Sequence, residues 1–263
     1  LTNPPLNTPF LQSVGKTYNI TIGDAELNNF VKVTLPLNEA EGHLAITHWN
    51  GKYWDILGGT IEGNFITTFL KDLSPISVKK LLSTSTNFKP ELHGYKFKNI
   101  GINIAINNKY YNFMDGICCG MAVTSAGGIF EYNISPPESQ NFYDLPINWQ
   151  KYILDTQESQ ITNIINIITN LKDIFFDSGT INDLGLLYEK LSNDYPVILY
   201  LSKDKYLSID RIMHAVVAYK VEIISNSSIK IYVYDPNFPN RNDLFFIISQ
   251  NILKRGYKLT YDY

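Results

Sequence analysis

The chain has 263 residues, of which 44% are hydrophobic and 18% are charged, and its formal net charge is −3. This balance is enough to bury the core of one large domain or two modest ones, and it excludes a disordered chain. The 22 Lys and Arg residues are scattered and form no basic stripe, so we expect no nucleic-acid partner.

We also expect no membrane span in this chain. No apolar run approaches the roughly 18 residues that cross a bilayer, and the longest candidate, residues 161–176, is interrupted by Asn and Lys. The sequence begins at Leu1 without a charged-then-apolar leader, which favours a processed or trimmed product.

The two cysteines of the chain are neighbours, Cys118 and Cys119. A disulfide between neighbours needs a strained ring, so we expect both thiols to be free.

Residues 1–82 predict an all-β, sandwich-like module. Residues 31–35 alternate apolar and polar side chains, as a half-buried strand does. Residues 44–49 and 53–57 flank Asn50-Gly51, and an Asn-Gly pair between apolar runs indicates a hairpin because both residues tolerate positive φ. A second hairpin is predicted from residues 60–62 and 65–70. Short strands at this spacing are typical of a sandwich.

Part of this module carries a motif of aromatic and glycine residues: His48-Trp49-Asn50-Gly51, Trp54, Gly58-Gly59 and Ser74-Pro75. The motif resembles small β-sandwich modules of microbial surface proteins. The resemblance implies an extracellular or cell-surface setting and no chemistry. The alternative is a β extension packed on the main domain.

Residues 83–263 predict a second domain of the α+β class. Residues 83–90 are polar and suit a linker. Helices are then predicted at residues 117–132, 158–176 and 180–191, the last two with apolar residues at helical spacing. Strands follow at residues 197–201, 215–221, 229–234 and 244–248. Helices first and an antiparallel β region second is an α+β arrangement.

Cys118 stands where a loop enters a predicted helix, between Gly116 and Gly120. Unpaired N–H groups and the helix dipole at a helix start stabilise negative charge, and hence a thiolate. The two glycines allow close approach of backbone and substrate. Cys118 is therefore the expected nucleophile, and Cys119 is the alternative.

His214 and Asp235 are the expected partners of this nucleophile. His214 begins an otherwise apolar strand, where it can project into a cleft and take the proton of a thiol. Asp235 ends the next predicted strand. In a hairpin these two positions lie side by side, so Asp235 can accept from the second ring nitrogen of His214. The alternatives are a buried cysteine, a core histidine, and an aspartate that forms the turn before Pro236.

Four segments together carry a family resemblance: His93-Gly94-Tyr95-Lys96-Phe97-Lys98-Asn99, Gly116-Ile117-Cys118-Cys119-Gly120-Met121-Ala122, the His214 strand through Tyr219, and Tyr234-Asp235-Pro236-Asn237-Phe238-Pro239. They resemble the papain-like cysteine peptidase superfamily, most closely a microbial, extracellular branch. The resemblance implies a papain-like fold of helices plus an antiparallel sheet or barrel, and a peptide or protein substrate. We expect no cofactor and no metal, because two adjacent thiolates cannot easily share a tetrahedral ion.

The sequence departs from the family pattern at Cys119, where Tyr or Phe is usual. Asn112 lies six residues before Cys118, the offset at which papain-like enzymes carry a side-chain amide that donates to the oxyanion, although that amide is usually Gln. Counted from Cys119 the same offset gives Phe113, which cannot donate. The resemblance therefore implies Cys118 as nucleophile, and Asn112 with the backbone N–H of Cys118 as oxyanion donors.

The function that follows is thiol-dependent hydrolysis of peptide or isopeptide bonds through a Cys118-His214-Asp235 triad and an acyl-enzyme. The same triad order also serves transglutaminase-like acyl transferases and amidases, since the cleft decides whether an amine or water accepts the acyl group. A third reading is a catalytically inactive surface-binding protein. The residue pattern leaves these alternatives open.

Overall fold

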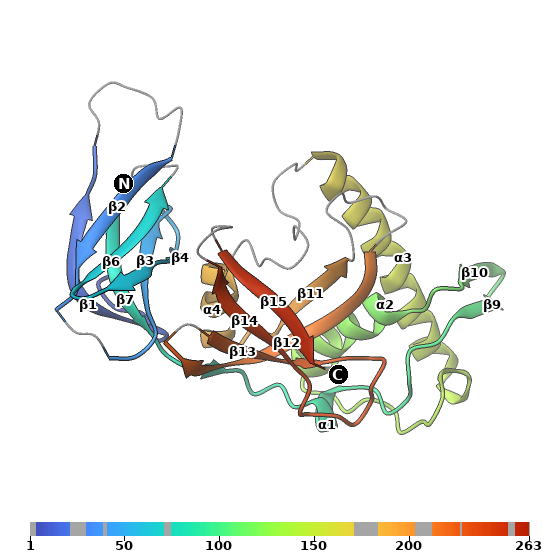
Figure 1. Cartoon of the computed structure of the whole chain (residues 1–263). Helices are drawn as coiled ribbons and strands as arrows, with labels where there is room; N and C mark the ends of the chain where they lie inside the picture. The colour runs from blue at the N-terminus through green and yellow to red at the C-terminus, as the bar shows by residue number, and fades with distance from the viewer. Residues whose placement is uncertain are drawn as a thin grey trace.

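The computed structural model describes residues 4–21, 30–38, 41–70, 75–170, 184–202, 212–226, 228–251 and 256–262. Of the described residues, 43% are in strands and 22% in helices, the sheets are mostly antiparallel, and the fold is broadly of the α+β class (Figure 1). Strands of the N-terminal part lie at one end of the molecule, α2 (Cys118–Val123) and α3 (Ile147–Asn170) lie toward the other end beside the C-terminal sheet, and α4 (Leu184–Ser192) lies between the N-terminal strands and that sheet.

Residues 11–81, which we call the β module, form two packed sheets. One sheet has the order β1-β7-β3-β4, with bounds Leu11–Asn19, Pro75–Leu81, Leu44–Trp49 and Trp54–Gly58. The other has the order β2-β6-β5, with bounds Val31–Pro36, Phe65–Leu70 and Thr60–Glu62. Apolar side chains from β2, β3, β6 and β7 form one buried cluster between them. Two antiparallel sheets with a buried cluster between them are the arrangement expected of the predicted sandwich-like module.

Both predicted hairpins are confirmed, β3 with β4 and β5 with β6. Gly51 and Gly63 adopt φ values of 97° and 58° in their turns, a region that glycine enters at little cost. Ser74 of the surface-module motif lies outside the described residues. The sequence did not predict β1 or β7, because neither segment alternates apolar and polar residues along its length.

The described residues from 84 onwards, which we call the α+β body, contain a six-stranded sheet. Its main path is β11-β12-β13-β14-β15, with bounds Val197–Ser202, Ile212–Ser225, Ser228–Tyr234, Phe245–Asn251 and Gly256–Asp262. Helices cover both faces of β12: Ala215 and Val217 join one buried cluster with the Cys118 helix, whereas Val216 and Ala218 join another with α4 (Leu184–Ser192). A strand buried on both faces is apolar throughout, which explains the uninterrupted run that follows His214.

Within the predicted linker at residues 83–90, two residues are part of this sheet. Strand β8 (Thr84–Ser85) pairs with Lys220 and Val221 of β12, and Phe88 is 2% exposed. The segment is therefore ordered in part, because hydrogen bonding to a distant strand fixes polar residues that have no apolar pattern of their own.

The helices differ from prediction mainly in their limits. The helix predicted at residues 117–132 is α2 (Cys118–Val123), continued as a π-helix, η1 (Thr124–Phe130). Helix α3 (Ile147–Asn170) starts directly after Pro146, well before residue 158, and the predicted residues beyond 170 lie outside the described residues. Residues 180–183 of the next predicted helix also lie outside them, and α4 covers the remainder.

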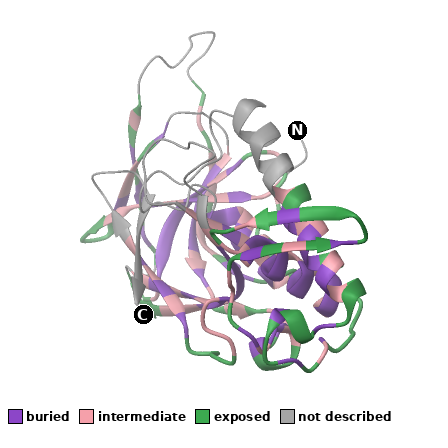
Figure 2. Ribbon diagram, turned by 90° about the vertical axis from the view of Figure 1, so that its right-hand side faces the viewer, coloured by how far each residue is buried: buried purple, intermediate pink, exposed green. Residues whose placement is uncertain are grey.

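A hairpin of β9 (Ile102–Ile106) and β10 (Lys109–Phe113) precedes α2, and the short helices α1 (Pro90–His93) and η2 (Phe142–Asp144) complete the described helices. The hairpin is exposed along much of its length (Figure 2). Lys109 at its tip forms ion pairs with Asp155 at 2.9 Å and Glu158 at 2.5 Å, which fix the hairpin to α3.

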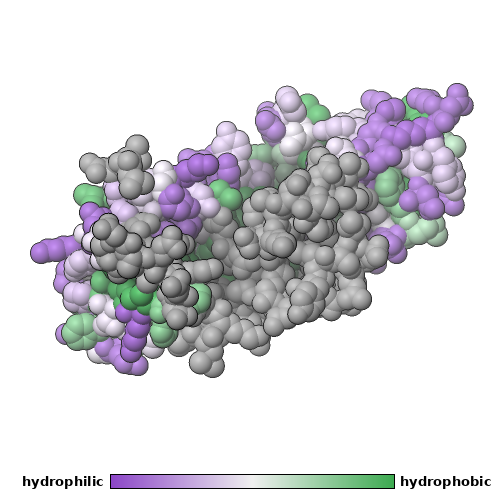
Figure 3. All heavy atoms as spheres, turned by 90° about the horizontal axis from the view of Figure 1, so that it is seen from above, coloured by the Kyte–Doolittle hydropathy of each residue, from purple (hydrophilic) through white to green (hydrophobic). Residues whose placement is uncertain are grey.

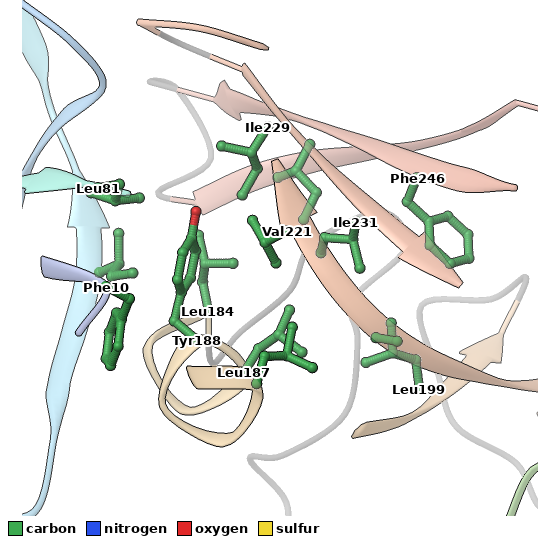
Figure 4. Close-up of a cluster of buried hydrophobic side chains, with 14 of the residues drawn as sticks. Phe10, Leu81, Leu184, Leu187, Tyr188, Leu199, Val221, Ile229, Ile231 and Phe246 are labelled. Atoms are coloured by element: carbon green, nitrogen blue, oxygen red, sulfur yellow. The ribbon is translucent and has the colours of Figure 1, made fainter. Parts of the chain in front are cut away.

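The β module packs directly on the α+β body. Leu81 and Phe10 from the module side meet Tyr188 of α4, and the same cluster continues into β12, β13 and β14 (Figure 4). Gly185 lies so close to Trp54 that a Cβ there would collide with its carbonyl oxygen. The module is thus joined to the body through a shared hydrophobic core.

Seen from above, hydrophilic and hydrophobic side chains are interspersed at both ends of the molecule (Figure 3). Among the described residues, no helix combines the length and the apolar character that crossing a bilayer requires.

Candidate active site

Cys118 is the first residue of α2, at the end of a glycine-containing loop. Gly116 has φ 113°, a backbone conformation that L side chains rarely adopt. The N-cap residue, Ile117, makes no side-chain capping bond, and no described residue accepts from the backbone N–H of Cys118. The sulfur therefore sits beside an uncapped helix start, where partial positive charge favours a thiolate.

The first turn of α2 is held against α3. A Cβ on Gly120 would collide with the Ile153 carbonyl oxygen of α3, and the Gly120 N–H donates to Gln157 Oε1 over 2.6 Å. Gly120 therefore serves close helix packing, and it is buried away from any substrate. This packing fixes the position of α2, and so of Cys118, against α3.

The structure brings His214 and Asp235 together. His214 lies on β12, two residues after the strand begins, and Asp235 directly follows β13. Nε2 of His214 is 2.5 Å from Asp235 Oδ1, and their side chains are 12% and 1% exposed. Asp235 also forms the turn, because its Oδ1 accepts from the Asn237 N–H at 2.7 Å. Asp235 therefore both pairs with His214 and accepts a hydrogen bond within the turn.

Cys118 lies close enough to His214 to contribute to the electrostatics of the imidazole. Since Nε2 faces Asp235, Nδ1 is the ring nitrogen left for the sulfur. Burial lowers the pKa of His214, but the interactions with Asp235 and Cys118 outweigh burial and raise that pKa to about 9. The imidazole is therefore held as an imidazolium near neutral pH, between a carboxylate and a sulfur.

Cys119 has a different environment from its neighbour. It is 5% exposed, and its thiol donates to the Tyr200 hydroxyl over 3.7 Å. Burial raises the pKa of Cys119 to about 12, so this thiol stays protonated and unreactive near neutral pH. Cys118, by contrast, is partly exposed and lies near the imidazole of His214. Between the two candidate nucleophiles, the geometry favours Cys118.

Asn112 is not part of this hydrogen-bonded group. It lies on β10 opposite Asn103 and is exposed, and none of the hydrogen bonds between described residues joins its amide to the loop of Cys118. The six-residue offset does not bring it there because the intervening residues include the end of an extended hairpin strand.

The amide that the structure does bring to this loop is Asn99, which the sequence reasoning did not single out. Its Oδ1 accepts from the Ile117 N–H at 2.6 Å, and its Nδ2 donates to Asn237 Oδ1 at 3.0 Å. Both asparagines stand inside the quoted motifs, Asn99 at the end of the segment that starts at His93 and Asn237 after Asp235. Their positions in those motifs were the available signal.

The other histidines have structural environments. His43 is 1% exposed and bonded to the Ser225 carbonyl across the module junction. His48 pairs with Asp55 at 3.4 Å, and the His93 ring packs on Phe88. Within the described ranges, no group of three or more His, Cys, Asp or Glu residues is arranged to hold a metal ion.

Comparison with known proteins adds no relative: no protein-family model, no curated protein and no solved structure matches this chain. The chemistry of the site is therefore argued from its own side chains.

Proposed function

We propose that this chain is a thiol-dependent peptidase of the papain-like type, with Cys118 as nucleophile, His214 as general base and acid, and Asp235 as the group that orients the imidazole. One observation carries the proposal: His214 is hydrogen-bonded to Asp235 and lies close enough to Cys118 for the sulfur to act on the imidazole. The nucleophile stands on a helix and its two partners on a sheet, an arrangement of elements that agrees with the papain-like fold proposed for this part of the chain.

The reaction follows from this geometry. His214 takes the proton of Cys118, and the sulfur attacks the carbonyl carbon of a peptide or isopeptide bond. The backbone N–H of Cys118 donates to the oxyanion. His214 then gives its proton to the leaving amine, and an acyl-enzyme remains. Water, deprotonated by His214, hydrolyses the thioester and restores the thiol, so that one amide and one water become one acid and one amine.

Asp235 has two effects in this cycle. Its carboxylate faces Nε2, which leaves Nδ1 for the sulfur and fixes the tautomer. Its negative charge also stabilises the imidazolium that forms when Cys118 loses its proton. The substrate is proposed to be an extracellular or cell-surface peptide or protein, and this setting depends on the resemblance of the β module to surface-protein modules.

Alkylation kinetics test the proposal without a known substrate. Iodoacetamide should modify Cys118 at least about tenfold faster than a free model thiol at about pH 6.5, because a paired thiolate is populated there and an isolated thiol is about 1% ionised. Peptide mass spectrometry separates Cys118 from Cys119, which should remain unmodified. The His214→Gln variant should lose the fast reaction, and His48→Gln, in a histidine–aspartate pair remote from the site, should keep it.

Labelling of Cys118 no faster than a free thiol, with His214 intact, would overturn the proposal in favour of an inactive binding protein. If labelling is fast, incubation of the wild type with a peptide mixture and an added amine decides the acceptor. Cleaved peptides indicate hydrolysis, and amine-linked peptides indicate a transglutaminase-like transferase.

A further inference from the structure

Two asparagine side chains join the loop of Cys118 to the turn that follows β13. On one side, Asn99 accepts from the N–H of Ile117, the residue before the nucleophile. On the other, Asn99 donates to Asn237, whose own Nδ2 lies 3.3 Å from His214 Nε2. The chain of contacts therefore runs from the backbone beside the sulfur to the edge of the imidazole.

The orientation of both amides is fixed by the backbone. A peptide N–H can only donate, so the Asn99 atom that faces Ile117 is the oxygen, and the atom that faces Asn237 is the nitrogen. The Asn237 atom that accepts is then its oxygen, which leaves its nitrogen toward His214. Because Asn237 Nδ2 is a donor, it cannot accept the Nε2 proton of His214, which goes to the Asp235 carboxylate. The 3.3 Å approach of Asn237 Nδ2 to Nε2 is therefore a packing contact beside the imidazole.

Main-chain contacts tighten the same connection. The Asn99 N–H donates to the Pro236 carbonyl at 2.7 Å, and the Asn237 N–H donates to Asp235 Oδ1 at 2.7 Å. A Cβ on Gly116 would lie 2.7 Å from both amide atoms of Asn99, so this glycine is required for the loop to lie against the side chain. The loop of the nucleophile and the turn of the base are thus held through one residue, Asn99.

We propose that Asn99 and Asn237 are positioning residues, an amide clamp that sets the separation of Cys118 and His214. This inference rests on the proposed function. Cys118 is carried by α2 and His214 by the sheet, and proton transfer between a thiol and an imidazole tolerates little change in distance. A displacement of about 1 Å at a catalytic group can cost about 100-fold in rate. The clamp joins the two elements beside both reacting side chains.

The test measures the iodoacetamide alkylation rate of Cys118 against pH in the wild type, Asn99→Ala, Asn237→Ala and the double variant. With the clamp broken, the imidazole no longer lies where it can take the proton of the sulfur. We expect at least about a tenfold loss of rate at about pH 6 and less than about a threefold change at about pH 9.5, where thiols ionise unaided. The double variant should match the slower single variant, because the two side chains act through one contact.

The matched control is Asn148→Ala, an exposed asparagine in the first turn of α3, which should keep the wild-type profile. Urea unfolding of each variant separates local repositioning from loss of fold, since misfolding lowers the rate at every pH. A fast wild type with an unchanged Asn99→Ala profile, or with additive effects in the double variant, rejects the clamp and leaves the proposed function standing. A slow wild type rejects both.

Discussion

Replacing Asp235 with Asn measures how strongly the buried carboxylate controls His214. Asp235 is 1% exposed, and its Oδ1 lies 2.5 Å from the ring nitrogen. Burial alone would lower the pKa of His214, yet the pKa rises from 6.5 to about 9 through the interactions with Asp235 and Cys118. At 1.36 kcal/mol per unit, this rise corresponds to about 3 kcal/mol. In Asp235→Asn the burial remains and the carboxylate is gone, so we expect the His214 pKa to return to about 6.5 or lower.

The same change predicts how stability depends on pH. Because the folded pKa of His214 lies above the unfolded value, the pair stabilises the fold fully below about pH 6.5, and this stabilisation is lost as the pH rises through about 9. The difference in free energy of unfolding between the wild type and Asp235→Asn should therefore be about 3 kcal/mol below pH 6.5 and should shrink toward zero by about pH 9.

Urea unfolding at stepped pH measures the stability difference, and NMR titration of the imidazole C–H resonances measures the pKa. The matched control is Asp55→Asn, which acts on the His48 pair at 3.4 Å, where the Asp55 side chain is 32% exposed. That control should leave the His214 titration unchanged. A stability difference that is independent of pH, or a His214 pKa that Asp235→Asn does not lower, would refute the reasoning.

Three substitutions test the packing that holds the site. Cys119→Ala should cost about 1 kcal/mol of stability through lost burial and keep Cys118 alkylation within about threefold of wild type; a larger loss of rate would implicate the second thiol. Gly120→Ala should cost about 1–3 kcal/mol in urea unfolding, because the new Cβ pushes α2 from α3, whereas Gly127→Ala, with its nearest neighbour 4.0 Å away, should change stability by less than about 1 kcal/mol. Gly185→Ala should cost about 1–3 kcal/mol by forcing α4 from the Trp54 carbonyl, and an unchanged unfolding midpoint would contradict the close packing at that junction.

Local patterns were enough for much of the fold. Strands β5 and β6 and their turn follow the predicted residues, because period-two alternation and a glycine turn are properties of neighbouring residues. Strand β12 was foreseen from its apolar run, although it begins at Ile212. Pro146 could have indicated the early start of α3, since proline favours the first turn of a helix.

For the candidate site, too, local sequence indicated some features and packing decided the others. The sequence alone placed Cys118 at a helix start, and it gave His214 and Asp235 as strand-end partners through motif order. The choice of Cys118 over Cys119 needed burial, because the two cysteines share almost the same local sequence. Likewise, the strand formed by Thr84–Ser85 depends on its pairing with β12, which lies far away in the chain.

Asn99 and Asn112 show most clearly what the tertiary structure decided. Spacing from Cys118 favoured Asn112, but Asn99 bonds a residue 18 positions along the chain and Asn237, 138 positions away. Residue type and spacing report the local chain path, whereas these contacts exist only once the helical and sheet elements have packed together. The sequence by itself thus determined which side chains can do the chemistry, and packing decided which of them meet.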